Sequence, residues 1–382
     1  MEVDDMTYFE ALRVTLEPVT STHVWSGVEV VVGIDAVMEG GKLKLIDLDK
    51  TLSELPEYVM QTLNLTNIRS TLMTLRGRGL LRYKAEVPLA TQVSDGDRIR
   101  LLSPITVPGS TLKGYIRTAL AFYKLNSMNV SDAIKLLNEG VNLKVKPINV
   151  GQGVEGRLFK AEKLRRQGGL FDVMAYLSVS DPLMAQGLSY FVRKLIVVDR
   201  VSFEEIASLK AITWDKGLLQ YDVQISGPPP VNLIGRSRQE ETLGDLRDHF
   251  IPRITVLLQD LTLNKLIDSL RAFGCTLVDD EIDKIAGVNR LAEYRKLLED
   301  IKRSFCMDRS DKCVVARLGF MTGHEAKTIA PFLKAKYPNL YDRVRNYMQA
   351  HMKRPWDSYT LKLVDFEGTL FGLGWCKLCL EI

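Results

Sequence analysis

The segment SPITVPGSTLKGYIRTAL, residues 103–120, constrains the fold more than any other part of the chain. Within it, Leu112, Ile116 and Leu120 recur every four residues after a Pro-Gly turn. Apolar residues at this spacing lie on one face of a helix, and that face has to be covered by a core. The segment therefore predicts a helix over roughly residues 110–125 that begins at a strand-to-helix junction.

Strand and helix patterns follow one another through both halves of the chain. YFEALRVTLE, RKLIVVDRVSF, LLQYDVQISG and GWCKLCLEI read as strands, and LTLNKLIDSLRAF reads as an amphipathic helix. A length of 382 residues favours two domains. We therefore predict an α+β fold with domains over residues 1–190 and 191–382. The first carries a basic loop insertion near 147–170, and the second a helical insertion near 239–305.

The charge balance does not by itself point to a partner. There are 51 basic and 47 acidic side chains, for a formal charge of +4. Only local clustering can then favour a nucleic acid. Arg78 and Arg82 lie in the basic segment TLRGRGLLRYKAEVPL, and Arg165 and Arg166 lie in the predicted loop insertion. Such runs are usually solvated, so these arginines are candidates for phosphate contact and nothing more specific.

The N-terminal segment and the apolar runs argue against export and against a membrane partner. The sequence MEVDDMTYFEALRVTLEP lacks the basic and apolar regions of a signal peptide. No apolar run reaches the ~20 residues that span a bilayer. We therefore expect a cytoplasmic protein.

The cysteine pattern argues against a metal site. The chain has five cysteines, an odd number, and without an export signal we expect reduced thiols. Cys376 and Cys379 form a CxxC, but on the expected terminal strand they point to opposite faces. Neither a second CxxC nor a His pair completes four ligands. We expect no metal and no cofactor.

The glycines and lysine of residues 103–120 resemble a phosphate-binding loop, but their order excludes the ATP-binding form. Gly109 and Gly114 have the required spacing, whereas Lys113 precedes the second glycine and Tyr115 follows it. A P-loop needs the lysine after that glycine and a hydroxyl next to it. Nucleotide hydrolysis is therefore disfavoured.

A nucleic-acid backbone suits the same residues better. Ser110 or Thr111 can cap the helix, and the first-turn N–H groups then point toward an anion. Lys113 and Arg117 lie one turn apart on one face, above Ser110. A well-capped amphipathic helix with a solvated basic face explains these residues equally well. Gly109 precedes Lys113 by four residues, and in FMTGHEAKTI Gly323 precedes Lys327 by the same number. The two matches are compatible with a duplicated unit.

Several motifs in a fixed order resemble one family. PGSTLKGYIRTA resembles the PGSSLKGxxRTA signature of the CRISPR RAMP superfamily. LEPVTSTHVWSGVE resembles the family's first strand and His-Ser-Gly loop, GGKLKLIDLDKTL its next strand pair and helix, and LSVSDP its VSD strand. ARLGFMTGHEAKTI and LGWCKLCLE resemble its second glycine loop and its closing strand. The order, from residue 14 to 381, most resembles subunits of the type III-A Csm effector.

The resemblance implies two ferredoxin-like, RRM-related halves and a non-catalytic place at the end of the Csm backbone. There the chain would cap the 3′ part of the guide RNA (crRNA) and support its maturation in antiviral defence. The implied partners are the guide RNA, the other Csm subunits, especially the backbone RAMP subunit, and host nucleases that trim the guide. The predicted RNA-binding residues are His23, Ser26, Gly27, Gly109, Ser110, Lys113, Arg117, Arg78, Arg82, Arg165, Arg166 and Lys327. The second loop departs from the family pattern, with Met321 in place of a glycine and Ala326 in place of a serine.

A metal-independent ribonuclease is the alternative function. It needs a base for the 2′-OH and an acid for the leaving oxygen, and His23 and His324 are the loop histidines that could serve. Neither has an evident partner in the sequence, so binding without catalysis is the prediction. Asp181 in VSDP fits a turn or cap residue before Pro182.

Overall fold

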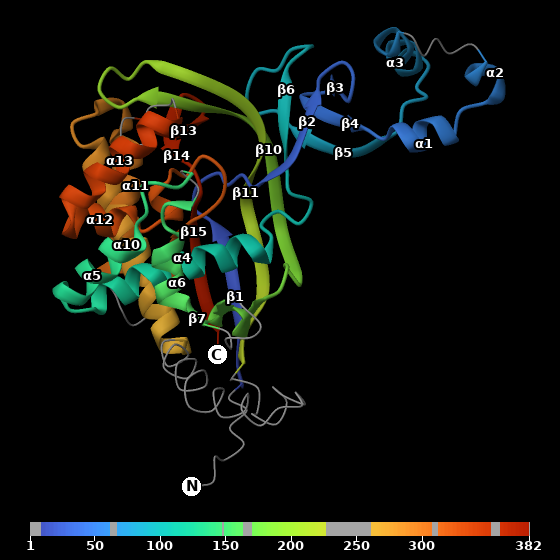
Figure 1. Ribbon diagram of the computed structural model, residues 1–382. Helices are drawn as coiled ribbons and strands as arrows, with labels where there is room; N and C mark the ends of the chain where they lie inside the picture. The colour runs from blue at the N-terminus through green and yellow to red at the C-terminus, as the bar shows by residue number, and fades with distance from the viewer. Residues whose placement is uncertain are drawn as a thin grey trace, which may run out of the picture.

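The computed structural model of the chain describes residues 9–61, 67–146, 149–162, 170–226, 261–307, 312–352 and 360–381. A large, mostly antiparallel sheet runs through the molecule, helices cover one of its faces, and a small unit projects from one edge (Figure 1). The expected mixture of helices and sheet is confirmed.

The central strands of the main sheet lie in the order β12 (Cys313–Arg317), β15 (Trp375–Glu381), β1 (Phe9–Pro18), β11 (Glu205–Ser226), β10 (Met184–Asp199), β13 (Thr360–Phe366) and β14 (Thr369–Gly372). Three further strands join it: β6 (Arg98–Leu102) and β9 (Leu177–Val179) pair with β11, and β2 (Trp25–Val31) pairs with β6. The strands predicted from alternation are therefore confirmed.

The position of β1 shows why alternating residues specify this sheet. Leu12, Val14 and Leu16 are each at most 4% exposed, because their shared face meets the helices. Val14 pairs with Tyr221 on one side and with Leu380 on the other. The first and last strands of the described chain thus lie side by side in the sheet.

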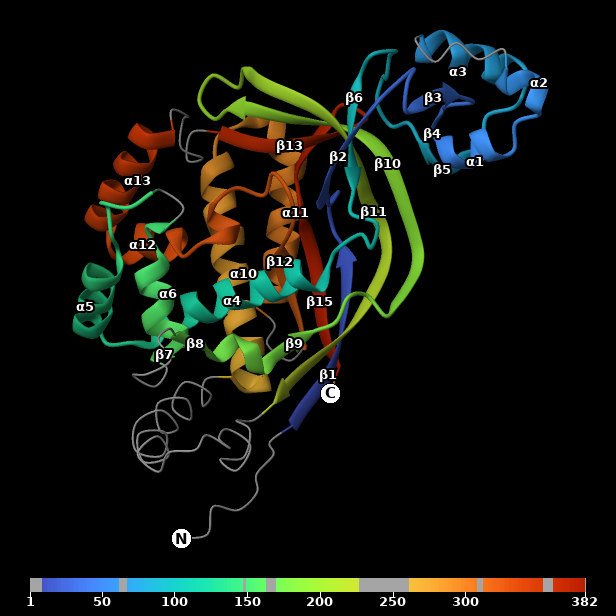
Figure 2. The same ribbon diagram turned by 45° about the vertical axis from the view of Figure 1, so that its right-hand side comes forward.

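The helices pack on one face of the sheet (Figure 2). They are α4 (Gly109–Ser127), α5 (Val130–Gly140), α6 (Gln152–Phe159), α10 (Leu263–Ile285), α11 (Ala292–Lys302), α12 (Ala330–Lys336) and α13 (Pro338–Met352). Short 3-10 segments lie at Val173–Tyr176, Asn289–Leu291 and Glu325–Lys327, and a π turn at Arg303–Met307.

The stripe on α4 confirms the helix predicted from its spacing. Leu112, Ile116 and Leu120 are 0%, 2% and 2% exposed. On the same helix Phe122 packs its ring 5.4 Å from that of Phe273 in α10. The helix is fixed against the sheet by α10, so its N-terminus has a defined position.

A small unit between β2 and β6 was not predicted as a separate body. It consists of β3 (Ala36–Glu39), β4 (Lys42–Ile46), α1 (Leu48–Ser53), α2 (Glu57–Met60), α3 (Ile68–Gly77) and β5 (Tyr83–Pro88). We call it the inserted unit, and it stands apart from the helical layer in Figures 1 and 2. Val59, Leu72 and Leu75 belong to a small core of its own.

The predicted loop over 147–170 is wrong for residues 152–159, which form α6 because Val154, Leu158 and Phe159 are buried in the main core. Next to it, β7 (Lys160–Glu162) pairs with β8 (Leu170–Asp172). The predicted helical region is confirmed from α10 to α11, and its part from 239 to 260 lies outside the described residues.

The division into two domains stays a prediction. Its boundary at residue 190 falls within β10, a single strand that pairs with β11 on one side and β13 on the other. Strands of both sequence halves therefore share one sheet.

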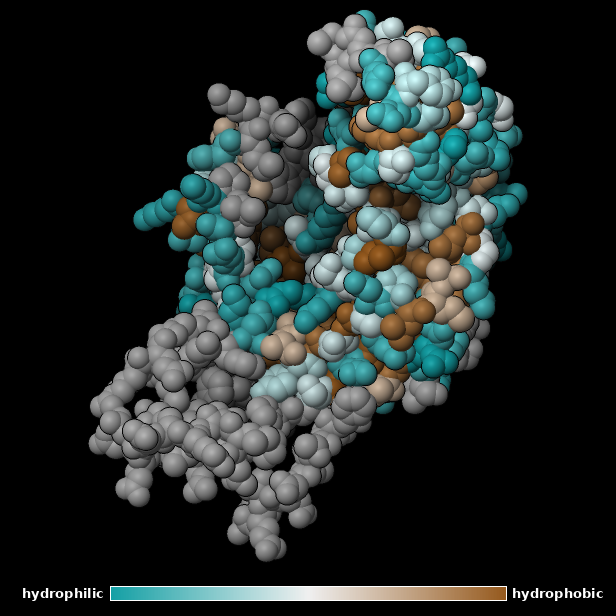
Figure 3. Space-filling model, turned by 90° about the vertical axis from the view of Figure 1, so that its right-hand side faces the viewer, coloured by the Kyte–Doolittle hydropathy of each residue, from teal (hydrophilic) through white to brown (hydrophobic). Residues whose placement is uncertain are grey.

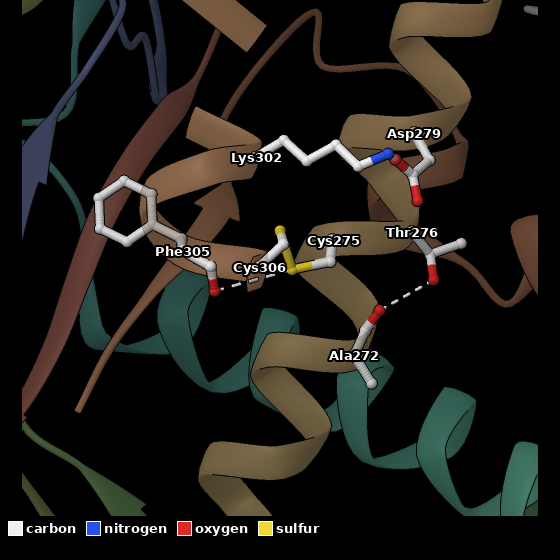
Figure 4. Close-up of a disulfide and its surroundings, with 7 residues drawn as sticks. All are labelled: Ala272, Cys275, Thr276, Asp279, Lys302, Phe305 and Cys306. Atoms are coloured by element: carbon white, nitrogen blue, oxygen red, sulfur yellow. Dashed lines mark hydrogen bonds and ion pairs between the residues drawn. A yellow bond between two sulfur atoms is a disulfide. The ribbon is translucent and has the colours of Figure 1, made fainter. Parts of the chain in front are cut away.

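The expectation of reduced thiols is wrong for four of the cysteines. Cys275 on α10 is bonded to Cys306 in the π turn, with Cα atoms 5.7 Å apart (Figure 4). Cys313 and Cys379 are bonded across the paired strands β12 and β15. Cys376 is a buried free thiol, so the CxxC is split between a disulfide and the core, as its alternation on a strand predicted.

Within the described ranges, no helix combines the length and apolarity that a bilayer span requires.

Candidate nucleic-acid interface

The N-terminus of α4 is held by a neighbouring turn rather than by its own hydroxyls. The predicted Ser110 or Thr111 cap is wrong, because the helix begins at Gly109 after Pro108, with no side-chain cap bond from the latter. Instead the backbone N–H of Gly109 donates to Oδ1 of Asp181 at 2.8 Å. Asp181 is thus a cap residue, but for a helix far away in sequence.

The turn that contains Ser180 and Asp181 also explains why residue 109 is a glycine. A Cβ at Gly109 would lie 2.1 Å from the carbonyl oxygen of Ser180 and 2.8 Å from that of Val179. Both are backbone atoms, which cannot move aside as a flexible side chain can. The absent side chain lets the turn after β9 lie directly against the start of α4.

Two hollows flank the first turns of α4. One, of about 470 Å³, is lined by Ile105, Pro108, Ser110, Lys113, Ala175, Leu177, Ser178, Val179 and Asp181, and we call it the lysine hollow. The other, of about 430 Å³, is lined by Val24, Trp25, Ser110, Thr111, Gly114, Tyr115, Thr118, Arg317, Leu318, Gly319, Phe320, Ala326 and Lys327, and we call it the aromatic hollow. Ser110 lines both, so the beginning of α4 forms a ridge between them.

The wall of the aromatic hollow opposite α4 is built by two loops packed on each other. The backbone N–H of Phe320 donates to the carbonyl oxygen of His23 at 2.6 Å. Gly319 has φ +102°, and a Cβ there would lie 2.5 Å from the same oxygen. The loop after β12 therefore needs glycine to reach the loop between β1 and β2.

A buried ionic cluster supports the loop after β12, residues 318–327, which we call the glycine loop. Arg317 pairs with Glu281 of α10 at 2.8 Å, and Lys284 pairs with Glu325 at 2.9 Å. Burial raises the pKa of Glu281, but the charges of Arg317 and Lys284 hold it below its ordinary value. The hydroxyl of Tyr294 donates to the same carboxylate. Both ends of the loop are thus anchored to α10 through desolvated charges.

His23 is in the interior, which corrects the expectation of an exposed loop histidine. Its side chain is 0% exposed, and Nδ1 lies 2.8 Å from the carbonyl oxygen of Ile212. Because a carbonyl only accepts, Nδ1 carries the proton and donates. Burial lowers the pKa of His23 to about 4, despite the opposing effect of this bond. The ring therefore positions the loop and offers no nitrogen at the surface.

The neighbouring family-motif residues are also structural. Ser26 Oγ donates to the carbonyl oxygen of Leu101 at 3.0 Å, which ties β2 to the end of β6. Gly27 has φ +87°, a conformation that glycine adopts without strain. These two residues shape the start of β2 beside the aromatic hollow.

The exposed aromatic side chain of this site was missed from the sequence. Trp25 is 41% exposed, and its ring centroid lies 6.1 Å from that of Phe320. The guanidinium of Arg100 lies 4.6 Å from the Trp25 ring and 4.9 Å from the Phe320 ring. Glu29 fixes that arginine through a 2.9 Å ion pair. An aromatic residue inside each of the two family loops, HVWSG and GFMTG, was the signal available in the sequence.

The structure separates the predicted basic residues. Lys113 lines the lysine hollow and makes no ion pair with another described residue, and Lys327 lines the aromatic hollow. Arg117 points away into a cluster, where it pairs with Asp172 at 2.8 Å and Glu155 at 3.3 Å. It therefore does not extend a basic stripe from Lys113.

The remaining predicted arginines lie elsewhere. Arg78 is exposed at the end of α3, and Arg82 is paired with Glu54, both in the inserted unit. Arg165 and Arg166 lie outside the described residues.

Apolar residues are gathered on part of the neighbouring surface. Figure 3 shows them as a band that extends from below the inserted unit across the middle of that face. Val28, Ile105 and Leu183, from segments next to the two hollows, are 51%, 40% and 64% exposed. An interface at this place would therefore combine apolar and basic contacts.

No family model matches the chain. Over 390 residues it is 23% identical to the CRISPR system protein Csm5 of Methanocaldococcus jannaschii, which covers 91% of this chain and 84% of the relative.

Solved structures share the fold over nearly the whole chain. One is a chain of the Csm–crRNA–target RNA ternary complex of a type III-A CRISPR-Cas system, with a TM-score of 0.64 at 18% identity and 97% and 100% of the two chains covered. Another is the crystal structure of T. onnurineus Csm5, with a TM-score of 0.59 at 15% identity and 95% and 99% covered. The predicted resemblance, which among Csm subunits is strongest to the fifth, is confirmed.

Proposed function

We propose that this chain, which is Csm5-like in sequence and fold, is a guide-RNA-binding subunit of a type III-A CRISPR effector complex. In the complex it would contact the other Csm subunits, cap the backbone at the 3′ end of the guide and support guide maturation in antiviral defence. The support comes from a relative named Csm5 and from a structural neighbour that is part of a Csm–crRNA–target RNA complex. Two ferredoxin-like halves, divided near residue 190, belong to the same proposal.

The observation that carries RNA contact is the ridge at the start of α4. The ridge is rigid, because Asp181 caps it and the Ser180 turn packs on Gly109. A lysine lines each flanking hollow, Lys113 on one side and Lys327 on the other. A phosphodiester that crosses the ridge would meet two ammonium groups, while the Asp181 carboxylate already occupies the first N–H of the helix. We therefore assign the RNA path to this ridge, and not to the inserted unit.

We propose that binding is non-catalytic. General acid–base cleavage of RNA needs an accessible group that exchanges protons near neutral pH. His23 is buried with a pKa of about 4, and its Nδ1 is engaged with a backbone carbonyl. His324 lies 3.2 Å from Glu325, which is itself paired with Lys284. His23 is thus used to hold its loop, and His324 has its neighbour's carboxylate beside its Nδ1.

The test is the salt dependence of RNA binding by the purified chain. Lys113→Ala should weaken binding of single-stranded RNA and lower the slope of log K against log salt by about 1. The control is Lys135→Ala, which removes an exposed lysine from α5, on the far side of the helical layer. It should leave both quantities unchanged. An unaltered slope in a folded Lys113→Ala protein would reject the ridge as the RNA path.

The nuclease alternative is tested on the same samples. Labelled RNA should stay intact with and without EDTA. Specific cleavage that is lost in His324→Ala would replace the proposed function by a ribonuclease. If the wild-type chain binds no RNA in the assay, the RNA-binding proposal fails for the isolated subunit.

A further inference from the structure

The aromatic hollow contains exposed aromatic rings, which a contact with phosphate alone would not require. Trp25 is 41% exposed, whereas Trp214 and Trp375 are fully buried. An exposed tryptophan at the edge of a hollow is a surface on which a planar ring can stack. Phe320 stands 6.1 Å from it at an interplanar angle of 56°, so the two rings form an angled wall.

The wall is rigid before any ligand arrives. Arg100 stacks on both rings and is held by Glu29, and the backbone of Phe320 is tied to that of His23. Aromatic side chains fixed in this way lose little conformational entropy on binding. A preformed wall favours a flat, rigid ligand over a flexible chain.

The rest of the lining is mixed, with the apolar side chains of Val24, Leu318 and Ala326 beside a smaller number of polar groups. Ser110, Thr111 and Thr118 bring hydroxyls from α4, and Lys327 brings an ammonium group from the glycine loop. At Gly114, a Cβ would have no atom within 4 Å, so the floor is not filled by a side chain. The Thr118 hydroxyl donates to the carbonyl oxygen of Gly114 at 3.1 Å and can only accept from a ligand. The hydroxyls of Ser110 and Thr111 can donate or accept, which suits the polar edge of a nucleobase better than an aliphatic side chain.

We propose that the aromatic hollow binds one unpaired nucleobase of RNA, stacked on Trp25 and Phe320. Its phosphate lies on the ridge at Ser110, next to Lys113. The inference rests on the proposed function and refines it, since it separates a base site from the phosphate path. The base has to be unpaired, because a ring in a duplex is already stacked on both faces. The hydroxyl lining sets no single donor and acceptor pattern, so the site accepts more than one base.

The experiment measures binding of a short single-stranded RNA and of copies with one abasic position moved along it. Trp25→Ala should weaken binding about 5- to 100-fold. Unlike Lys113→Ala, it should leave the slope of log K against log salt unchanged. Trp25→Phe should recover most of the affinity. Tyr58→Ala is the control, because Tyr58 is a 70% exposed aromatic residue on α2 in the inserted unit.

Two readouts do not depend on affinity alone. RNA should quench the fluorescence of Trp25, and the quenching should disappear in Trp25→Phe. One abasic position should weaken wild-type binding and have no further effect on Trp25→Ala. If Trp25→Ala does not fold, Phe320→Leu is tested in the same way.

The outcomes separate this inference from the proposed function. RNA binding that depends on Lys113 but not on Trp25, Phe320 or any abasic position would overturn the base site and leave the RNA-binding function intact. Quenching and abasic sensitivity that remain in a folded Trp25→Ala, Phe320→Ala double variant would also overturn it. An absence of any RNA binding would defeat both.

Discussion

Replacing Gly109 by alanine should destabilise the protein, whereas the same change at Gly114 should not. The two glycines lie five residues apart on α4, so helix propensity favours alanine at both by up to about 1 kcal/mol. What differs is the space around each position. A Cβ at Gly114 meets nothing within 4 Å, but at Gly109 it would lie 2.1 Å from the Ser180 carbonyl oxygen.

The loss of stability in Gly109→Ala can be estimated from the two contacts that the new Cβ would disrupt. Separating α4 from the Ser180 turn by the required amount resembles overpacking, which costs about 1–3 kcal/mol. It also stretches the bond from the Gly109 N–H to the Asp181 carboxylate, worth about 1.5–3 kcal/mol as a bond to a charged group. After the gain in helix propensity is subtracted, we therefore expect Gly109→Ala to lower the free energy of unfolding by about 2–5 kcal/mol. Gly114→Ala should raise it by about 0.5–1 kcal/mol.

Urea unfolding followed by circular dichroism measures both variants against the wild type, with equal slopes required for the comparison. A second prediction of the same geometry is that Gly109→Ala loses RNA affinity, because it displaces the ridge. The reasoning is refuted if Gly109→Ala is as stable as the wild type. It is also refuted if Gly114→Ala is destabilised to the same extent, since the loss would then belong to the helix and not to the turn.

Three further predictions concern His23 and the cysteines. Since the pKa of His23 falls from 6.5 in the unfolded chain to about 4 in the fold, the unfolded state binds more protons between these values, and stability should be lost as pH falls from about 6.5 toward 4. The loss in the free energy of unfolding is about 3 kcal/mol. His23→Asn, which keeps a donor for Ile212, should make the free energy of unfolding independent of pH over this window. An unchanged pH profile in this variant would contradict the role given to His23. With two disulfides among five cysteines, one free thiol per chain should react after denaturation without reductant, whereas five would contradict the pairing. Removing the Cys275–Cys306 bond, which spans 31 residues, should cost about 3–4 kcal/mol in the chain-entropy model, measured by urea unfolding of the double serine variant.

Local patterns in the sequence predicted the elements well, because each element is specified by neighbouring residues. The stripe on α4 and the alternation of β1 depend only on spacing, and both have the expected buried faces. The cap of α4 was predicted wrongly because the sequence offers nearby hydroxyls at Ser110 and Thr111. The acceptor used instead, Asp181, reaches the helix only through the tertiary fold.

The candidate site was predicted only in part, because some of its contacts also depend on the tertiary fold. Lys113 could be placed beside the helix N-terminus from spacing alone. Arg117 shares its helical face but is withdrawn by Asp172 and Glu155, which come from segments that the sequence does not connect to α4. His23 was expected at the surface as a loop residue, but β11 covers it. Trp25 was overlooked because a single tryptophan in a loop has no pattern until Phe320 is brought beside it.

The position of β15 between β12 and β1 has a consequence for the synthesis of the protein. β1 emerges early from the ribosome, but one of its two edges receives its partner only when residues 375–381 have been made. Until then the nascent chain carries open strand edges on both β1 and β12, which are sites where chains aggregate. The closure of the sheet is therefore a late event, and pairings this distant in sequence fold slowly. The N–H of Leu318 donates to the carbonyl oxygen of Gly374, so the loop after β12 can be held in place only after this last strand has formed.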